Sequence, residues 1–145
     1  MNYYLGIDLG TTAVKVGIFT AAGDAAGIVL SEYALETPAT DIVELEPEIY
    51  WRATVAAVEA AFGEARIERT AVQAAAITGQ AETLICLDET GQPLRKAIVW
   101  LDNRAVAEAA ELTRQFGAEA MFRLSGQTEV LPCFPGPKIR WLATH

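Results

Sequence analysis

The first residues that suggest chemistry form the motif DLGTT, which begins at Asp8 and is followed shortly by Lys15. In a glycine turn of this kind, backbone N–H groups and hydroxyls can point at phosphate oxygens, and Gly10 lets the backbone approach a ligand closely. We therefore predict phosphate contacts from Gly10, Thr11 and Thr12. Asp8 can hold Mg²⁺ through water, and Lys15 can reach a transferred phosphoryl group as a point charge. A plain hairpin turn with a solvated lysine fits the same residues.

Two later polar runs suit a ligand rich in hydroxyl groups. In GQAE, which begins at Gly79, the Gln80 amide can donate and accept while Glu82 can accept from hydroxyls. In WLDNR, Trp100 can cover the C–H face of a sugar while Asp102 accepts from its hydroxyls. Plainer interpretations remain for both runs, because GQAE can be an ordinary turn, Trp100 a core residue and Asp102 a helix N-cap.

The elements that must position these residues begin with three strands. Apolar side chains alternate over residues 3–9 and 13–19 and form a run at 27–30, so the first 35 residues predict a three-stranded antiparallel meander. A polar, acidic stretch follows at 31–46, in which alternating glutamates such as Glu44 predict a solvated loop.

The rest of the chain alternates helices and strands. A helix is predicted from Pro47 to Gly63 or a few residues beyond, with its apolar stripe at steps of four, three and four, namely Trp51, Val55, Val58 and Phe62. Another helix is predicted from 103 to about 117, and a proline-rich tail over 125–137. The remaining apolar runs predict a buried strand at 72–78 and short strands at 83–87 and 97–100. This order predicts an α/β domain with a mixed sheet and flanking helices.

Composition limits the class of protein. The 145 residues, 52% of them hydrophobic and 21% charged, make one globular domain or part of one. The net charge of −8 argues against nucleic acid or an anionic membrane as partner, because both require a cationic face. Cys86 and Cys133 lie far apart and indicate neither a disulfide framework nor a zinc site. With no signal peptide and no apolar stretch of about 20 residues, we expect a cytoplasmic protein.

Taken together, the motifs resemble the FGGY carbohydrate kinases, the group that contains xylulokinase, ribulokinase and glycerol kinase. The resemblance runs nearly end to end, and three separated motifs in register are far more specific than one. The segments that carry it are GIDLGTT with Lys15, ITGQ from Ile77, AIVWLDNR from Ala97, SG from Ser125 and KIRWL from Lys138.

The resemblance implies a ribonuclease-H-like mixed sheet, one half of the actin-like ATPase fold. Members transfer the γ-phosphoryl group of MgATP to a sugar or polyol hydroxyl. By position, Asp8 is similar to the magnesium-linked acid of the family, and Lys15 to the basic residue that faces the transferred group. The family's phosphate-contacting positions fall on Gly10, Thr11 and Thr12, and its substrate-side positions on Gln80, Ala81, Glu82, Trp100 and Asp102.

Departures from the family pattern narrow the expected substrate. Glycerol kinases carry arginine at the position of Ala81 and tyrosine near Cys133, so two polyol contacts of that subfamily are absent. Xylulokinases carry Met-His where this chain has Ala81 and Glu82, although residues 132–138 resemble their tail. A ketose such as a xylulose-like pentulose is preferred over glycerol.

The length sets a further expectation, because family members are several times longer than 145 residues. We expect residues 1–145 to be the N-terminal part of domain I of a kinase. Its catalytic-base aspartate and C-terminal nucleotide-binding domain would lie outside the chain, leaving the fragment inactive alone. A non-catalytic actin-like module that responds to nucleotide is the alternative, and a homodimer is possible because cutting inside a domain exposes apolar surface.

Overall fold

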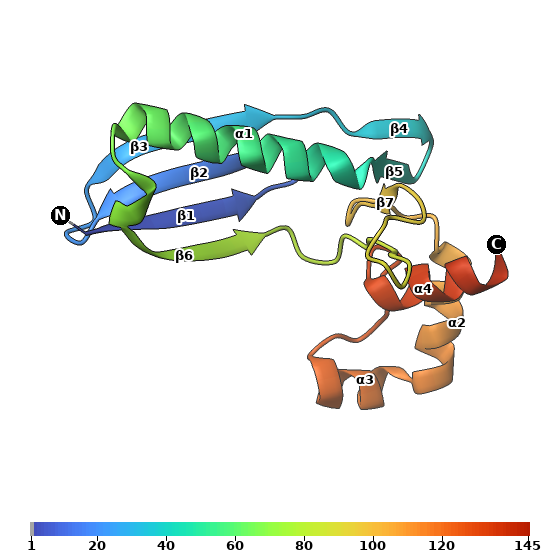
Figure 1. The fold of residues 1–145 in the computed structure, drawn as a ribbon. Coiled ribbons are helices and arrows are strands. Elements are labelled where there is room, and N and C mark those ends of the chain that lie inside the picture. The colour runs from blue at the N-terminus through green and yellow to red at the C-terminus, as the bar shows by residue number, and fades with distance from the viewer. Residues whose placement is uncertain (1) are drawn as a thin grey trace. The chain divides into compact units, whose positions relative to one another are not determined.

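The computed structural model describes residues 2–145, which form two compact units. Unit 1 comprises Met1–Leu35 and Glu46–Gln80, and unit 2 comprises Glu36–Leu45 and Ala81–His145. The helices and strands labelled in Figure 1 are β1 (Tyr3–Leu9), β2 (Ala13–Thr20), β3 (Ala25–Glu32), β4 (Glu36–Ala39), β5 (Ile42–Leu45), α1 (Pro47–Ala65), β6 (Val72–Gly79), β7 (Ala97–Ile98), α2 (Val106–Phe116), α3 (Ala118–Ser125) and α4 (Pro135–Thr144). A 3₁₀ turn, η1 (Arg69–Ala71), precedes β6.

Unit 1 is a mixed sheet with one long helix. Its strand order is β3-β2-β1-β6, in which β1 pairs antiparallel with β2 and parallel with β6. Helix α1 lies along β2 and β3 on one face of this sheet (Figure 1). The predicted meander over the first 35 residues is confirmed, and so are the start of the helix at Pro47 and its end just beyond Gly63.

The core of unit 1 lies between this sheet and α1. Val14, Val16 and Ile18 of β2 are fully buried there, against Ala57 and Ala61 of the helix. Small alanine side chains let α1 approach the sheet closely, and so the buried face of the helix is built on them.

The predicted apolar stripe of α1 is therefore only partly right. Val58 and Phe62 pack against the core, but Trp51 and Val55 are 64% and 41% exposed. The buried residues Tyr50, Ala57 and Ala61 follow the same spacing one position earlier, on a neighbouring face of the helix. The sequence pattern therefore did not show that the alanine-rich face is the one that the sheet covers.

Strand β6 also differs from its prediction. It was expected to be buried, yet most of it is exposed, and Ile77 is 70% exposed. The reason is its place in the sheet, because β6 is the last strand and α1 packs mainly on β2 and β3. An apolar run cannot distinguish a central strand from an edge strand whose face is uncovered.

Unit 2 joins a small sheet to three helices. The sheet has the order β4-β5-β7, with antiparallel pairing throughout. Strands β4 and β5 fall in the stretch predicted as an acidic loop, so that prediction is wrong. The turn between them places Asp41 in the left-handed region, with φ of 64°.

Other expected boundaries in unit 2 shift as well. The strand predicted at 83–87 reduces to isolated bridges, Leu84 with Ile98 and Leu87 with Pro93, and the strand predicted at 97–100 stops at Ile98. The last three residues of the predicted proline-rich tail are helical, because α4 begins at Pro135. Proline suits the first turn of a helix, where its missing N–H has no intrahelical partner.

Across residues 2–145, none of the helices combines the length and the apolar character that crossing a bilayer requires.

Replacing Gly27 by alanine should destabilise unit 1. A Cβ there would lie 2.8 Å from the Ala61 carbonyl oxygen and 3.0 Å from the Ala65 nitrogen, so α1 would have to move away from β3. We expect a loss of about 1–3 kcal/mol in the free energy of unfolding, measured by urea titration.

The matched control is Gly63→Ala, in the interior of α1, where a Cβ meets nothing within 4 Å. It should leave stability unchanged or raise it by roughly 0.5–1 kcal/mol through helix propensity. Equal effects of the two substitutions would contradict close packing at Gly27.

Candidate functional site

The turn between β1 and β2 is built on a glycine that cannot be replaced without strain. The Gly10 N–H donates to the Ala13 carbonyl oxygen at 2.9 Å, and a Cβ on Gly10 would lie 2.8 Å from that same oxygen. Thr11 and Thr12 form the tip of this turn, and Thr12 is exposed. The predicted phosphate residues therefore lie together in a tight hairpin turn that keeps Thr12 at the surface.

Asp8, Lys15 and Thr78 form a row across three neighbouring strands. Asp8 is the register partner of Lys15 on β2 and of Thr78 on β6. Because side chains alternate along a strand, the burial of Val14 and Val16 against α1 directs Lys15 to the opposite face. That placement of Lys15 is as predicted.

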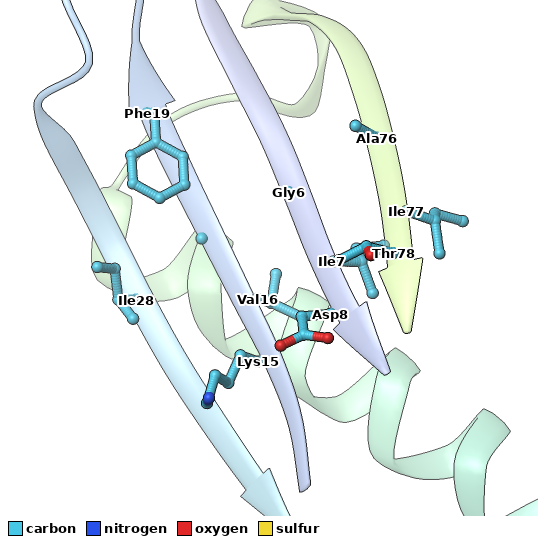
Figure 2. Close-up of a pocket in the computed structure, with 11 residues that line it drawn as sticks. Gly6, Ile7, Asp8, Lys15, Val16, Phe19, Ile28, Ala76, Ile77 and Thr78 are labelled. Carbon is cyan, nitrogen blue, oxygen red and sulfur yellow. The ribbon is translucent and has the colours of Figure 1, made fainter. Parts of the chain in front are cut away.

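This row borders an open groove of about 380 Å³ on the face of the sheet opposite α1. The groove is floored by Gly6 and Gly17, and Figure 2 shows the ring of Phe19 farther along the same face than the Asp8 and Lys15 side chains. The strands thus present one acidic and one basic group at the end of an apolar surface.

Tyr33, directly after β3, holds both ends of the glycine turn. Its backbone N–H donates to the Thr12 carbonyl oxygen at 2.9 Å, and its hydroxyl donates to the Gly10 carbonyl oxygen. Burial, with smaller contributions from Tyr50 and Asp8, raises the pKa of Tyr33 to about 12. The hydroxyl therefore stays protonated and able to donate. Sequence reasoning missed Tyr33, because no local motif marks it.

Gln80 lies beside the glycine turn because β1 and β6 run parallel. Its backbone N–H donates to the Leu9 carbonyl oxygen at 2.8 Å, and its Nε2 donates to the Tyr50 hydroxyl at 3.0 Å. Within the described residues, the Oε1 atom of Gln80 is buried without a hydrogen-bond partner. Unit 1 thus brings Gln80 to the same sheet edge as the predicted phosphate residues.

In unit 2, the predicted substrate residues Ala81, Glu82 and Trp100 occupy connecting segments. Glu82 adopts a left-handed conformation with φ of 69°, which is uncommon for a non-glycine residue. The backbone N–H of Trp100 donates to the Thr83 hydroxyl at 3.1 Å. This hydrogen bond ties the segment that carries Trp100 to the segment that carries Glu82, while Ala81 is exposed.

Asp102 is fully buried, and its role as a helix N-cap is not confirmed, because α2 begins at Val106 with Ala105 at the N-cap. Its carboxylate accepts from the Val43 N–H at 2.7 Å and from the Arg104 side chain at 2.8 and 2.9 Å. Burial acts to raise the pKa of Asp102, but these hydrogen bonds outweigh it and hold the pKa below its usual value.

Glu44 of β5 belongs to the same charged network, so it is not the solvated acid that the sequence predicted. It accepts from Arg104 at 2.7 Å and from Arg95 at 2.8 Å. Both guanidinium groups also lie over the Trp141 ring, at 5.0 and 5.7 Å from its centroid. Both arginines lie about 50 or more positions away in sequence, so a charge pattern in an assumed loop cannot reveal these ion pairs.

Lys138 of α4 is the other charged residue that is fully buried in unit 2. Its Nζ donates to the Val99 carbonyl oxygen at 2.9 Å, and burial lowers the pKa of Lys138. The backbone on either side of Trp100 is therefore fixed, on one side by Lys138 and on the other by Asp102.

No group of three or more His, Cys, Asp or Glu side chains able to hold a metal ion occurs in residues 2–145. Each unit assembles its own predicted residues: unit 1 the set Asp8, Gly10, Thr11, Thr12, Lys15 and Gln80, and unit 2 the set Ala81, Glu82, Trp100 and Asp102.

The N-terminal domain of the FGGY family of carbohydrate kinases matches residues 3–145. A glycerol kinase from Chelativorans sp. (strain BNC1) is 36% identical over 142 residues, which cover 97% of this chain and 28% of that protein. A xylulose kinase from Staphylococcus xylosus is 30% identical over 145 residues, which cover 100% of this chain and 29% of that protein. The chain thus spans less than a third of the length of the curated relatives that it matches.

Among solved structures, a xyloylose kinase from Brucella ovis superposes with a TM-score of 0.91 at 31% identity. The superposition covers 99% of this chain and 30% of that one. It confirms the predicted fold class, a mixed sheet of the actin-like ATPase type with an N-terminal antiparallel meander.

Substituting Asp102 by asparagine should destabilise unit 2 and reduce its sensitivity to acid. Removing the charge leaves the buried Arg104 without one of its carboxylate partners, a change that costs about 3 kcal/mol in comparable buried pairs. The pKa of Asp102 is lower in the folded chain than the usual 3.9 or so of an unfolded chain. The ionised Asp102 carboxylate therefore contributes its full stabilisation of the folded chain above the unfolded-state pKa. This stabilisation is lost as the pH falls toward the folded-state pKa.

Urea unfolding of wild type and D102N, at pH 7 and at steps down to pH 3, measures both effects. The difference between the two proteins in the free energy of unfolding should become smaller as the pH falls. The exposed Asp24→Asn serves as control, with a change within about 0.5 kcal/mol. Parallel pH profiles for wild type and D102N would contradict the role given to the ionised carboxylate.

Proposed function

This chain belongs to the FGGY family of carbohydrate kinases, and from that premise we propose that a protein with this N-terminal domain transfers the γ-phosphoryl group of MgATP to a sugar or polyol hydroxyl. The observation that carries the proposal is the sheet edge of unit 1. There the Gly10 turn, the Asp8–Lys15–Thr78 row and Gln80 lie together. Phosphoryl transfer depends mostly on positioning and charge neutralisation, and this edge supplies groups for both.

The phosphate side of the proposed site is the turn and its flanking charges. Gly10 keeps this turn tight, because a Cβ there would meet the Ala13 carbonyl oxygen that accepts from the Gly10 N–H. A tight turn of this kind fits a backbone cradle for phosphate oxygens. A lone carboxylate such as Asp8 fits Mg²⁺, which commonly keeps several waters and takes one or two carboxylates with phosphate oxygens. MgATP supplies the electrophilic phosphorus, while Lys15 balances negative charge on the transferred group.

We assign the sugar side to Gln80, Ala81, Glu82 and Trp100. The buried Oε1 of Gln80 lacks a hydrogen-bond partner within the described residues, so it can accept from a substrate hydroxyl. The Trp100 ring suits the C–H face of a sugar. Asp102 has no exposed surface and is bound by Arg104 and the Val43 N–H, so we propose that it holds the Trp100 segment in place instead of contacting the substrate.

A ketose is our preferred substrate class. The small Ala81 stands where the resemblance leads us to expect the arginine of glycerol kinases, so a polyol contact of that subfamily is missing. The relatives that match include both glycerol and xylulose kinases, so their names alone favour neither substrate.

We also propose that the catalytic base is not among these residues. A base must come within hydrogen-bond reach of the attacking hydroxyl. Asp102 is enclosed by its own partners, and Asp8 is assigned to the metal. The isolated chain should therefore be inactive.

Sugar-dependent ATP turnover by the full-length protein tests this function, with pentuloses, other ketoses and glycerol as acceptors. Replacing Lys15 by methionine should lower kcat by roughly 10²–10³-fold, the range seen when one charge-stabilising group is removed. The KM for the sugar should change little, because Lys15 lies on the phosphate side. The control is Lys96→Met, which removes a lysine paired with Glu36 at the surface of unit 2.

If the wild-type protein binds or hydrolyses ATP but phosphorylates no acceptor, the proposed kinase activity is contradicted. That result would favour the alternative, a non-catalytic module that responds to nucleotide. Turnover by residues 1–145 alone, checked by circular dichroism to be folded, would overturn the assignment of the base. A kcat/KM for glycerol above that for every ketose would overturn the substrate preference.

A further inference from the structure

Two tyrosine hydroxyls in unit 1, one on a half-buried and one on a buried side chain, have no role in the function proposed above. They belong to Tyr33, after β3, and Tyr50, in the first turns of α1, whose rings meet edge to face with centroids 5.2 Å apart. Phenylalanine would fill the same space without a hydroxyl that must find a partner when buried. The two hydroxyls both make their hydrogen bonds with residues of the proposed site, Gly10 and Gln80 respectively.

Tyr33 fixes the peptide planes of the glycine turn. Its hydroxyl holds the Gly10 carbonyl and its backbone N–H holds the Thr12 carbonyl, so both carbonyls are turned toward one residue. In a planar trans peptide, the N–H of the following residue points away from the carbonyl. Fixing the Gly10 carbonyl therefore also fixes the direction of the Thr11 N–H. Without the hydroxyl, the Gly10 carbonyl would lose this hydrogen bond, while the backbone hydrogen bond at Thr12 would remain.

Tyr50 acts on the neighbouring residue in the same way. It is 9% exposed and its hydroxyl accepts from the Nε2 of Gln80, which fixes the direction of that amide. With Nε2 committed to Tyr50, the amide presents its Oε1 as an acceptor that has no partner within the described residues. Burial raises the pKa of Tyr50, partly offset by the hydrogen bond from Gln80.

We infer that Tyr33 and Tyr50 are positioning residues of the site, Tyr33 for the phosphate turn and Tyr50 for the sugar-facing amide of Gln80. The inference rests on the proposed kinase function. Neither hydroxyl is assigned a contact with a reactant, and each acts through one hydrogen bond. Because the tyrosine rings touch, a single aromatic pair supports both halves of the sheet edge.

Kinetics of Tyr33→Phe and Tyr50→Phe in the full-length kinase test the inference, with Tyr4→Phe as matched control. Tyr4 lies on the opposite face of β1 from the core and is 42% exposed. Loss of one positioning hydrogen bond corresponds to roughly a three- to tenfold effect. We expect Y33F to lower kcat and raise the KM for ATP by such factors with the sugar KM unchanged. Y50F should raise the KM for the sugar with the KM for ATP unchanged, and Y4F should match wild type.

A merely structural role would not divide the effects in this way. If Y33F and Y50F match Y4F, or if each changes both KM values alike, the inference is wrong. If wild type itself transfers no phosphoryl group, the proposed function fails first. Amide hydrogen exchange then still tests the turn, with faster exchange near Gly10 in Y33F than in Y4F supporting the clamp and equal exchange overturning it.

Discussion

The contact between Leu9 and Gly79 is the constraint on which unit 1 depends. A Cβ on Gly79 would lie 2.9 Å from the Leu9 Cβ and 3.0 Å from its carbonyl oxygen, so only glycine lets the ends of β1 and β6 approach this closely. The approach allows the Gln80 N–H to reach the Leu9 carbonyl. Two segments about 70 residues apart in sequence therefore end side by side, and the turn proposed to bind phosphate lies at the same edge as the Gln80 amide proposed to face the sugar.

In unit 2, buried charged side chains fix the position of the segment that carries Trp100. Trp100 stands between Val99, held by Lys138, and Asp102, held by Arg104 and the Val43 N–H. A buried ionic network is weak evidence for net stability, because desolvation offsets much of the attraction between the charges. Its contribution is geometric, since Asp102, Arg104 and Lys138 are each hydrogen-bonded in one arrangement. Close backbone packing in unit 1 and paired charge in unit 2 thus achieve the same fixed geometry by different physical means.

Local patterns predicted the parts of the fold that depend on local interactions. The meander and the start of α1 followed from alternation and from Pro47, and the DLGTT motif marked the turn between β1 and β2. Partners distant in sequence decided the rest. Glu44 forms ion pairs with Arg95 and Arg104, which follow it by about 50 and 60 residues. Asp102 is an ion-pair partner of Arg104 and not a helix cap, since α2 begins only at Val106. Tyr33 acquires its role from a hydrogen bond to Gly10, 23 positions away, which no spacing rule covers.

The division of the chain between its units also has a consequence for biosynthesis. The β4–β5 hairpin interrupts unit 1 in sequence but belongs to unit 2, where β5 pairs with β7. The partner strand begins at Ala97, so the hairpin leaves the ribosome well before it. At about 5–20 residues per second, the gap of about 50 residues lasts roughly 3 to 10 s. During that interval β3, α1 and β6 can already assemble, whereas Glu44 has no ion-pair partner until Arg95 and Arg104 have been translated.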